Sequence, residues 1–221
     1  RVSPDGHTYR MLTQSLCRRG QVRTATTLLD EMLHRGIPAD PLAYTTVLNA
    51  LCRKKQLREA YRLLCLMRGR GVSPDIVHYN TVIVGMCREG RPLDACKVIG
   101  DMTDNGCIPN AASYATVVNG LCVSGLFDKA ETYLEDMVSK GIVPHFSVFH
   151  SVIKGCCTVG KVEEAARMMS RVLDIGMPPH VETWSSVISS ICSDEDYVEV
   201  ILLQMLKGRG CCSKTISRST L

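Results

Sequence analysis

The sequence predicts an all-α fold, a right-handed α-solenoid (superhelix) of stacked helix-turn-helix repeats that are each 35 residues long. The first observation behind this expectation is an aromatic residue that recurs at one interval, as Tyr9, Tyr44, Tyr79, Tyr114, Phe149 and Trp184. The second is a cysteine at the same interval, as Cys17, Cys52, Cys87, Cys122, Cys157 and Cys192. Alanine and glycine follow the same period, and aromatic residues are scarce, which is typical of helices that pack on helices.

The period divides the chain into consecutive units. We expect five full repeats at 6–40, 41–75, 76–110, 111–145 and 146–180, then a degenerate sixth or capping repeat at 181–208 and a C-terminal tail at 209–221. Residues 1–5 (RVSPD) match the end of the segment 70–75 (RGVSPD), so we expect them to be the end of a preceding repeat. Because the first residue is arginine, we expect the chain to be part of a longer array or to have lost a leader.

Each unit is expected to form two helices joined by a glycine turn. In the third unit, apolar residues at helical spacing predict a first helix from Val77 to Arg88 and a second roughly from Leu93 to Thr103. Gly90 and Gly106 follow these helices, where a left-handed residue commonly ends a helix. The first of the two glycines is present in every full unit except the second, where Lys55 takes its place.

The six cysteines in register are expected to be structural. Cysteine is a small apolar side chain that suits a place where neighbouring helices approach closely. The other cysteines show no C-x-x-C spacing, so we expect no zinc site. His145, His150 and His180 could lie near one another, and we interpret them as exposed polar residues, with a metal site as the alternative. We expect no cofactor and no enzymatic activity, because no set of catalytic residues stands out.

The motif P-D-x-x-x-Y-N-T-V-I-x-G-x-C-x-x-G, followed by A…M…G-x-x-P, resembles the repeat of the pentatricopeptide repeat family. It is present in the units that start at Pro41, Ile76 and Ala111, and it is recognisable in all six. The uniform period resembles the P-type subclass. No apolar run reaches membrane-spanning length, so we expect no membrane segment. The resemblance implies a protein that binds single-stranded RNA in an organelle, with one base per repeat on the concave face. The mitochondrion is the expected organelle and the chloroplast is the alternative.

The resemblance also implies which residues select the bases. In this family they are the residue after the aromatic and the last residue of each unit. Here these are Arg10 and Asp40, Thr45 and Asp75, Asn80 and Asn110, Ala115 and His145, His150 and His180, and Ser185. By family logic, Thr45 with Asp75 favours G, and Asn80 with Asn110 favours a pyrimidine, C before U. The other pairs do not match a familiar combination.

Two further sets of residues are expected at the RNA. The resemblance implies that a side chain near the start of each unit clamps the bases, and these residues are His7, Leu42, Val77 and Ala112. The first-helix cysteine is followed by Arg18, Arg53 or Arg88 in the first three units. These arginines could follow the phosphates of an RNA backbone. The alternative is that they are solvated helix ends that complement the helix dipole.

The sequence leaves two functions open. One is an RNA-binding factor that acts in the processing, stability or translation of an organellar transcript. The other is a structural component of a large organellar ribonucleoprotein such as the mitochondrial ribosome, which contacts ribosomal RNA and proteins. Up to Asn110 the chain holds 16 Lys and Arg against 10 Asp and Glu, and beyond it 10 against 12. The basic first half favours a polyanionic partner, and the acidic second half with its incomplete base-reading pairs favours the second function.

Overall fold

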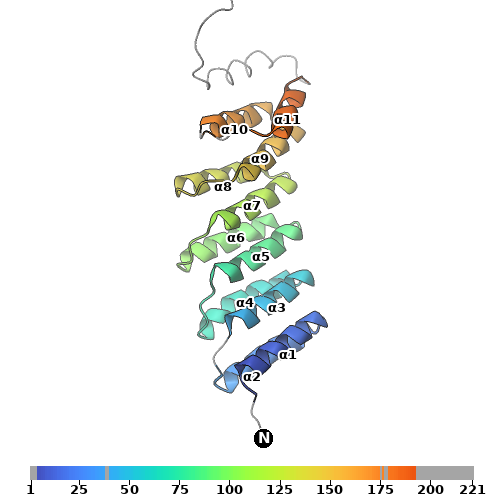
Figure 1. Cartoon of the computed structure of the whole chain (residues 1–221), viewed down its shortest axis with the longest axis vertical. Helices are drawn as coiled ribbons and strands as arrows, with labels where there is room; N and C mark the ends of the chain where they lie inside the picture. Colours follow the sequence, from blue (N-terminus) through green and yellow to red (C-terminus); the bar gives the residue numbers. More distant parts are fainter. Residues whose placement is uncertain (1–3, 38–39, 175, 177–178, 193–221) are drawn as a thin grey trace, which may run out of the picture. The chain divides into compact units, whose positions relative to one another are not determined.

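The computed structural model describes residues 4–37, 40–174, 176 and 179–192, and every regular element within them is a helix (Figure 1). The chain divides into two compact units, residues 1–143 and 144–221. The helices of the first unit are α1 (Gly6–Arg18), α2 (Val22–His34), α3 (Pro41–Arg53), α4 (Leu57–Gly69), α5 (Ile76–Arg88), α6 (Pro92–Asp104), α7 (Ala111–Val123) and α8 (Phe127–Ser139). Those of the second are α9 (Phe146–Thr158), α10 (Val162–Asp174) and α11 (Val181–Cys192).

The odd-numbered helices begin 35 residues apart, from Gly6 to Val181, and each of α1, α3, α5, α7 and α9 is followed by a second helix after a three-residue turn. The predicted all-α, helix-turn-helix solenoid is therefore confirmed. In the third predicted repeat, the two helices extend one residue beyond the predicted ends except at Arg88. Residues 193–221, which include most of the predicted capping repeat and the whole predicted tail, lie outside the described residues. None of the described helices is both long and apolar enough to cross a bilayer.

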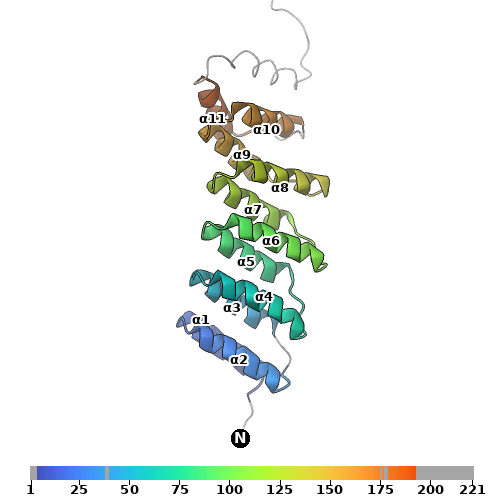
Figure 2. The same ribbon diagram turned by 180° about the vertical axis from the view of Figure 1, so that it is seen from behind.

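Two layers of helices form the first unit. The odd-numbered helices pack directly on one another, α1 on α3, α3 on α5 and α5 on α7. Each even-numbered helix packs on its own partner, and α2, α4 and α6 also pack on the odd-numbered helix that follows. Figures 1 and 2 show these layers from opposite sides. In the second unit, α9 packs against both α10 and α11.

The recurring aromatic residue is central to the core, as expected. Tyr44 and Tyr114 are fully buried, and Tyr9, Tyr79 and Phe149 are nearly so, whereas Trp184 is only half-buried. A buried phenol needs a partner for its hydroxyl. Tyr114 donates to Asp136 on α8 at 2.7 Å, and Tyr79 accepts from Asn105, the residue that follows α6, at 3.1 Å. In the third and fourth repeats the tyrosine therefore ties the first helix to the end of the second.

The recurring cysteine packs against a glycine of the next first helix. A Cβ atom built on Gly85 would lie 2.5 Å from the Cys52 sulfur, and one built on Gly120 would lie 2.7 Å from the Cys87 sulfur. These contacts confirm the prediction that cysteine marks a close helix approach. Burial raises the pKa of Cys52 to about 11 and that of Cys87 to about 12, so the nucleophilic thiolate is scarce at neutral pH.

The glycines that follow the helices adopt left-handed backbone angles, with φ of 69° at Gly90 and 75° at Gly106. Lys55 adopts the same conformation, with φ of 59°, and no other non-glycine residue in the described part of the chain has a positive φ. The turn geometry is therefore imposed by the packing of α3 and α4 even where glycine is absent, at the cost of local strain at Lys55.

The close approach at Gly120 predicts an asymmetric response to added methyl groups. We expect Gly120→Ala to lower the free energy of unfolding by about 1–3 kcal/mol, because the new Cβ overlaps the Cys87 side chain. The double variant Gly120→Ala with Cys87→Ala should recover part of this loss. Gly100→Ala is the control, because it lies in α6 with no atom within 4 Å of the added Cβ, and it should be neutral or stabilising. Equal losses in denaturant unfolding for both glycines would contradict this packing.

The strain at Lys55 predicts that a lysine-to-glycine substitution stabilises the protein. Lys55→Gly relieves a conformation that costs a non-glycine residue about 1 kcal/mol, and it loses only an exposed ion pair with Glu89. We expect a net gain of roughly 0.5 kcal/mol in the free energy of unfolding. Lys54→Gly, one residue earlier at a φ of −85°, should instead destabilise the protein. A destabilised Lys55→Gly would show that the ion pair outweighs the backbone strain.

Candidate nucleic-acid interface

The last residue of each of the first four predicted repeats is the N-cap of the next first helix. Asp75 accepts hydrogen bonds through Oδ1 from the backbone amides of Val77 at 2.8 Å and His78 at 3.1 Å. Such caps satisfy amide groups that have no partner within the helix. Asp40 caps α3, Asn110 caps α7, and His145 caps α9 in the same way. One acceptor of each of these four capping residues is therefore committed to the protein backbone.

The atom used in the cap determines which hydrogen-bonding atom of the capping residue remains available to a ligand. Asp75 uses Oδ1 in the cap, and its side chain is more than half exposed, so Oδ2 is left as an acceptor. Burial alone would raise the pKa of Asp75, but hydrogen bonds and the charge of the neighbouring His78 lower it below the usual value, and the group is a carboxylate at neutral pH. Asn110 uses Oδ1 in its cap at 3.0 Å from Ser113 N, which leaves its amide nitrogen as a donor.

The structure brings together both predicted base-reading residues of the third repeat. Asn80 lies on α5 and Asn110 precedes α7, and the hydroxyl of Ser113 joins them. Ser113 Oγ lies 2.7 Å from Asn80 Oδ1 and 3.0 Å from Asn110 Oδ1. The sequence prediction that Asn80 and Asn110 act as a pair thus has a structural counterpart, a shared hydrogen-bond partner.

The residues of the second repeat are connected through His78. The hydroxyl of Thr45 donates to the Pro41 carbonyl at 3.1 Å, and the His78 ring contacts the same carbonyl through Nε2 at 2.9 Å. The other ring nitrogen of His78 lies 2.6 Å from Asp75 Oδ1. These contacts of His78 link the N-terminal ends of α3 and α5. The ring is buried, so the link lies behind the two proposed base-reading side chains.

The first repeat differs, because its two predicted base-reading residues neutralise each other. Arg10 forms a salt bridge with Asp40, whose side chain is 17% exposed. An arginine is larger than the threonine or asparagine at the same position in the next repeats, and it occupies the free oxygen of the cap. The sequence did not predict this salt bridge, which pairs the charged groups of the two residues with each other.

The remaining predicted pairs are less complete. Ala115 lies on α7, and His145 caps α9 in the other compact unit. The His150 ring contacts the Thr183 hydroxyl at 2.6 Å, whereas His180 and Ser185 are exposed. Within the described residues, no group of three or more His, Cys, Asp or Glu side chains is arranged to hold a metal ion.

The proposed base-clamping residues are exposed next to the caps. Leu42 is 51% exposed and Val77 is 52% exposed, and His7 and Ala112 are also exposed. Each is the second residue of its first helix, three positions before the base-reading residue on that helix. Exposed aliphatic side chains that flank polar groups provide apolar surface on which a planar base can rest.

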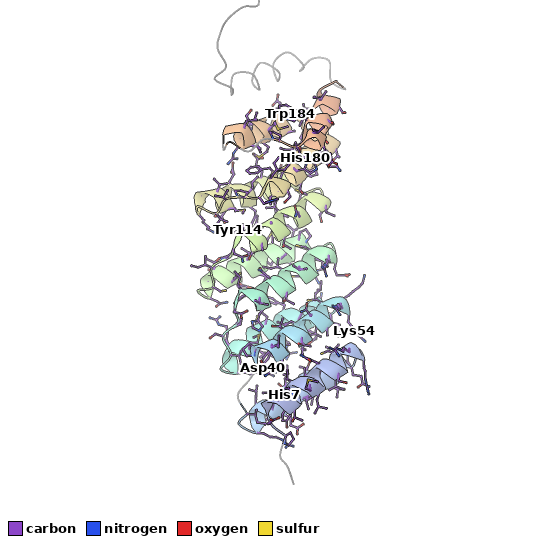
Figure 3. All side chains as sticks on the ribbon, viewed as in Figure 1. His7, Asp40, Lys54, Tyr114, His180 and Trp184 are labelled. Carbon is purple, nitrogen blue, oxygen red and sulfur yellow. The ribbon has the colours of Figure 1, made fainter. Side chains whose placement is uncertain are left out.

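Basic side chains lie at the opposite end of the first helices. Arg18, Arg53 and Lys54 line a cavity of about 560 Å³ between α1 and α3, together with polar residues and no acidic ones. Figure 3 shows Asp40 and Lys54 at opposite ends of α3. Arg88 is exposed at the corresponding end of α5. Two of the three arginines predicted to contact a backbone therefore share one basic cavity.

The third residue of each first helix was not singled out by sequence reasoning. From α3 to α11 it is Ala43, His78, Ser113, Val148 or Thr183, and all five are buried, whereas Thr8 in α1 is exposed. Three of them contact a base-reading residue through hydrogen bonds. The signal in the sequence was a polar residue repeated at one position of an otherwise apolar helix face.

The fold and the repeated caps define a helical repeat protein, and comparison with known families identifies the repeat. The model of the PPR repeat family matches residues 4–53, 39–77 and 74–123, that of the PPR repeat matches 112–142, and that of the pentatricopeptide repeat domain matches 133–194. The chain belongs to the pentatricopeptide repeat family. No significant match is found among curated protein sequences.

Solved structures of the same fold include RNA complexes. The crystal structure of the pentatricopeptide repeat protein PPR10 from maize is 21% identical and superposes with a TM-score of 0.75 over 93% of this chain. PPR10 in complex with an 18-nt psaJ RNA element is 25% identical, with a TM-score of 0.62 over 92% of this chain and 29% of PPR10. The PPR domain of Arabidopsis thaliana protein-only RNase P 1 in complex with tRNA is 18% identical, with a TM-score of 0.64 over 81% of this chain and 95% of that domain. The chain thus spans about a third of the length of PPR10, 31% in the RNA-free structure.

Proposed function

We propose that this chain binds single-stranded RNA along the N-terminal ends of its first helices, with one base facing each repeat. The observation that carries the proposal is the repeated arrangement of a half-buried polar residue, a capping residue with a free hydrogen-bonding atom, and an exposed flanking side chain. It recurs in the second repeat, with Thr45, Asp75 and Leu42, and in the third, with Asn80, Asn110 and Val77. Two solved structures of the same fold are RNA complexes, which supports RNA binding by this chain. We place the protein in a mitochondrion or chloroplast by its family.

The second and third repeats are the ones we propose to select bases. Thr45 with the free Asp75 oxygen suits a base with a ring N–H, and G is favoured. Asn80 with Asn110 suits a pyrimidine. Stacking contributes about 1–3 kcal/mol per base, so two selective repeats support only weak binding, and further repeats elsewhere in a longer protein are part of the proposal.

A second candidate function is a structural role in an organellar ribonucleoprotein such as a ribosome. The specific observation in its favour is the salt bridge between Arg10 and Asp40, which removes one repeat from base selection. Ala115 offers no hydrogen-bonding side chain in another. In that role the solenoid would contact ribosomal RNA through charge and shape, and proteins through the remainder of its surface.

The first experiment is selection from a randomised single-stranded RNA pool with the purified chain, followed by sequencing. We expect enrichment of a G–pyrimidine step. Asp75→Asn keeps an Oδ1 atom for the helix cap but replaces the free acceptor with a donor, so the enriched base should change from one with a ring N–H to one with a bare ring nitrogen. Asp75→Ala is a poorer test, because it also removes a cap worth about 1 kcal/mol.

Three further results decide between the candidates. Thr45→Asn should alter the same base as Asp75→Asn, because both residues face one position of the RNA. Unchanged thermal unfolding of both variants serves as the control for folding. Salt-sensitive binding without any enriched sequence would contradict base selection and favour the structural role, and no binding at all would contradict both.

The basic cavity predicts a specific salt dependence. Arg53→Gln should weaken binding of all RNA sequences alike and make the slope of log K against log salt less steep by about 0.7, as for one lost phosphate contact on a single strand. Arg62→Gln is the matched control, since Arg62 is an exposed arginine on α4, in the other layer. If both substitutions change the slope equally, the cavity is not a phosphate site and only net charge matters.

A further inference from the structure

Buried polar side chains gather at one position of the repeat. Among the described residues, the buried polar side chains are Thr13, His78, Ser113 and Thr183, and the last three are the third residues of α5, α7 and α11. A buried polar group costs free energy unless it is hydrogen-bonded. Each of these three contacts a proposed base-reading residue, so their polarity serves the residues in front of them.

The hydrogen bonds of Ser113 can be assigned by counting protons. Its backbone N–H donates to Asn110 Oδ1 at 3.0 Å, and its hydroxyl accepts from the Asn110 backbone N–H at 3.2 Å. A hydroxyl group has one proton to donate. The nearer acceptor is Asn80 Oδ1 at 2.7 Å, compared with 3.0 Å for Asn110 Oδ1, which the backbone N–H already serves. The proton therefore goes to Asn80.

This assignment fixes the orientation of both asparagines. Each Oδ1 atom is held inside the protein, and each Nδ2 group remains as a donor. Resting on the RNA binding proposed above, we propose that Ser113 is a positioning residue that turns the Asn80 amide so that the third repeat prefers cytosine to uracil. Cytosine presents two adjacent acceptors, N3 and O2, to two donors. Uracil has an N–H at N3, which faces a donor and forms no hydrogen bond with it.

The other repeats agree with a positioning role for the third residue. Thr183 contacts His150 Nδ1 at 2.6 Å, and His150 is the residue on α9 that corresponds to Asn80 on α5. Ala43 has no hydroxyl, and the corresponding Arg10 is held by Asp40 instead. The identity of the third residue thus changes which contacts the residue in front of it can make.

The test compares Ser113→Ala with Thr13→Ala. Thr13 is also a buried hydroxyl, but it donates to the Tyr9 carbonyl, away from the proposed interface. The first measurement is the NMR signal of the Asn80 side-chain amide in the RNA-free protein. We expect Ser113→Ala to shift this signal and increase the mobility of the amide, and Thr13→Ala to leave it unchanged. Ser113→Thr should restore it, because Thr183 shows that threonine fits at this position in α11.

The second measurement is the ratio of affinities for two single-stranded RNAs, taken from the enriched pool, that differ by C or U opposite the third repeat. We expect about a tenfold preference for C, as for one hydrogen bond, and a fall to roughly twofold or less in Ser113→Ala. An unchanged Asn80 amide signal, or an unchanged ratio in a folded Ser113→Ala variant, would overturn the proposal. If the chain binds no RNA, the proposed function fails, and the amide signal alone still decides whether Ser113 orients Asn80.

Discussion

The close packing of each first helix on the next is the interaction on which the other features depend. It buries the recurring tyrosine and requires glycine opposite cysteine at Gly85 and Gly120. The contact fixes the separation of the first-helix N-termini, and therefore the spacing of the caps that carry the proposed interface. A repeat protein of this kind has no long-range core, so its regularity comes entirely from such neighbour contacts.

The caps give one side chain two roles. A carboxylate or amide at the helix N-terminus stabilises the backbone through one atom and presents the other to a ligand. A residue that is proposed both to cap a helix and to contact a base needs a side chain with two hydrogen-bonding atoms, as in Asp75 and Asn110. The physical requirement for a cap thus narrows the set of residues with which a base can be selected.

Much of the fold could be predicted from the sequence because positions that make the same packing contact in each repeat carry the same residue type at a constant interval. Tyr79, Cys87 and Gly90 each occupy a position where one residue type is favoured by burial, close approach or a left-handed turn. The role of Ser113 could not be predicted in this way. The residues at this position of the repeat are of five different types. The proposed role depends on a hydrogen bond from the Ser113 hydroxyl to a residue 33 positions earlier in the chain. The Arg10–Asp40 salt bridge could not be predicted for the same reason, because it depends on a contact between two residues that are far apart in the sequence.

In the proposed RNA complex, the salt bridge between Arg10 and Asp40 gives the first repeat a weaker response to ionic strength than its neighbours. A base that approaches this repeat competes with an internal ion pair whose aspartate side chain is only 17% exposed, and salt screens such a partly buried pair much less than an exposed one. The proposed phosphate contacts along the same helices weaken as salt rises. The first repeat therefore remains electrostatically closed under the conditions that loosen the proposed attachment of the RNA backbone, so added salt weakens the attachment without adding a nucleotide at this repeat.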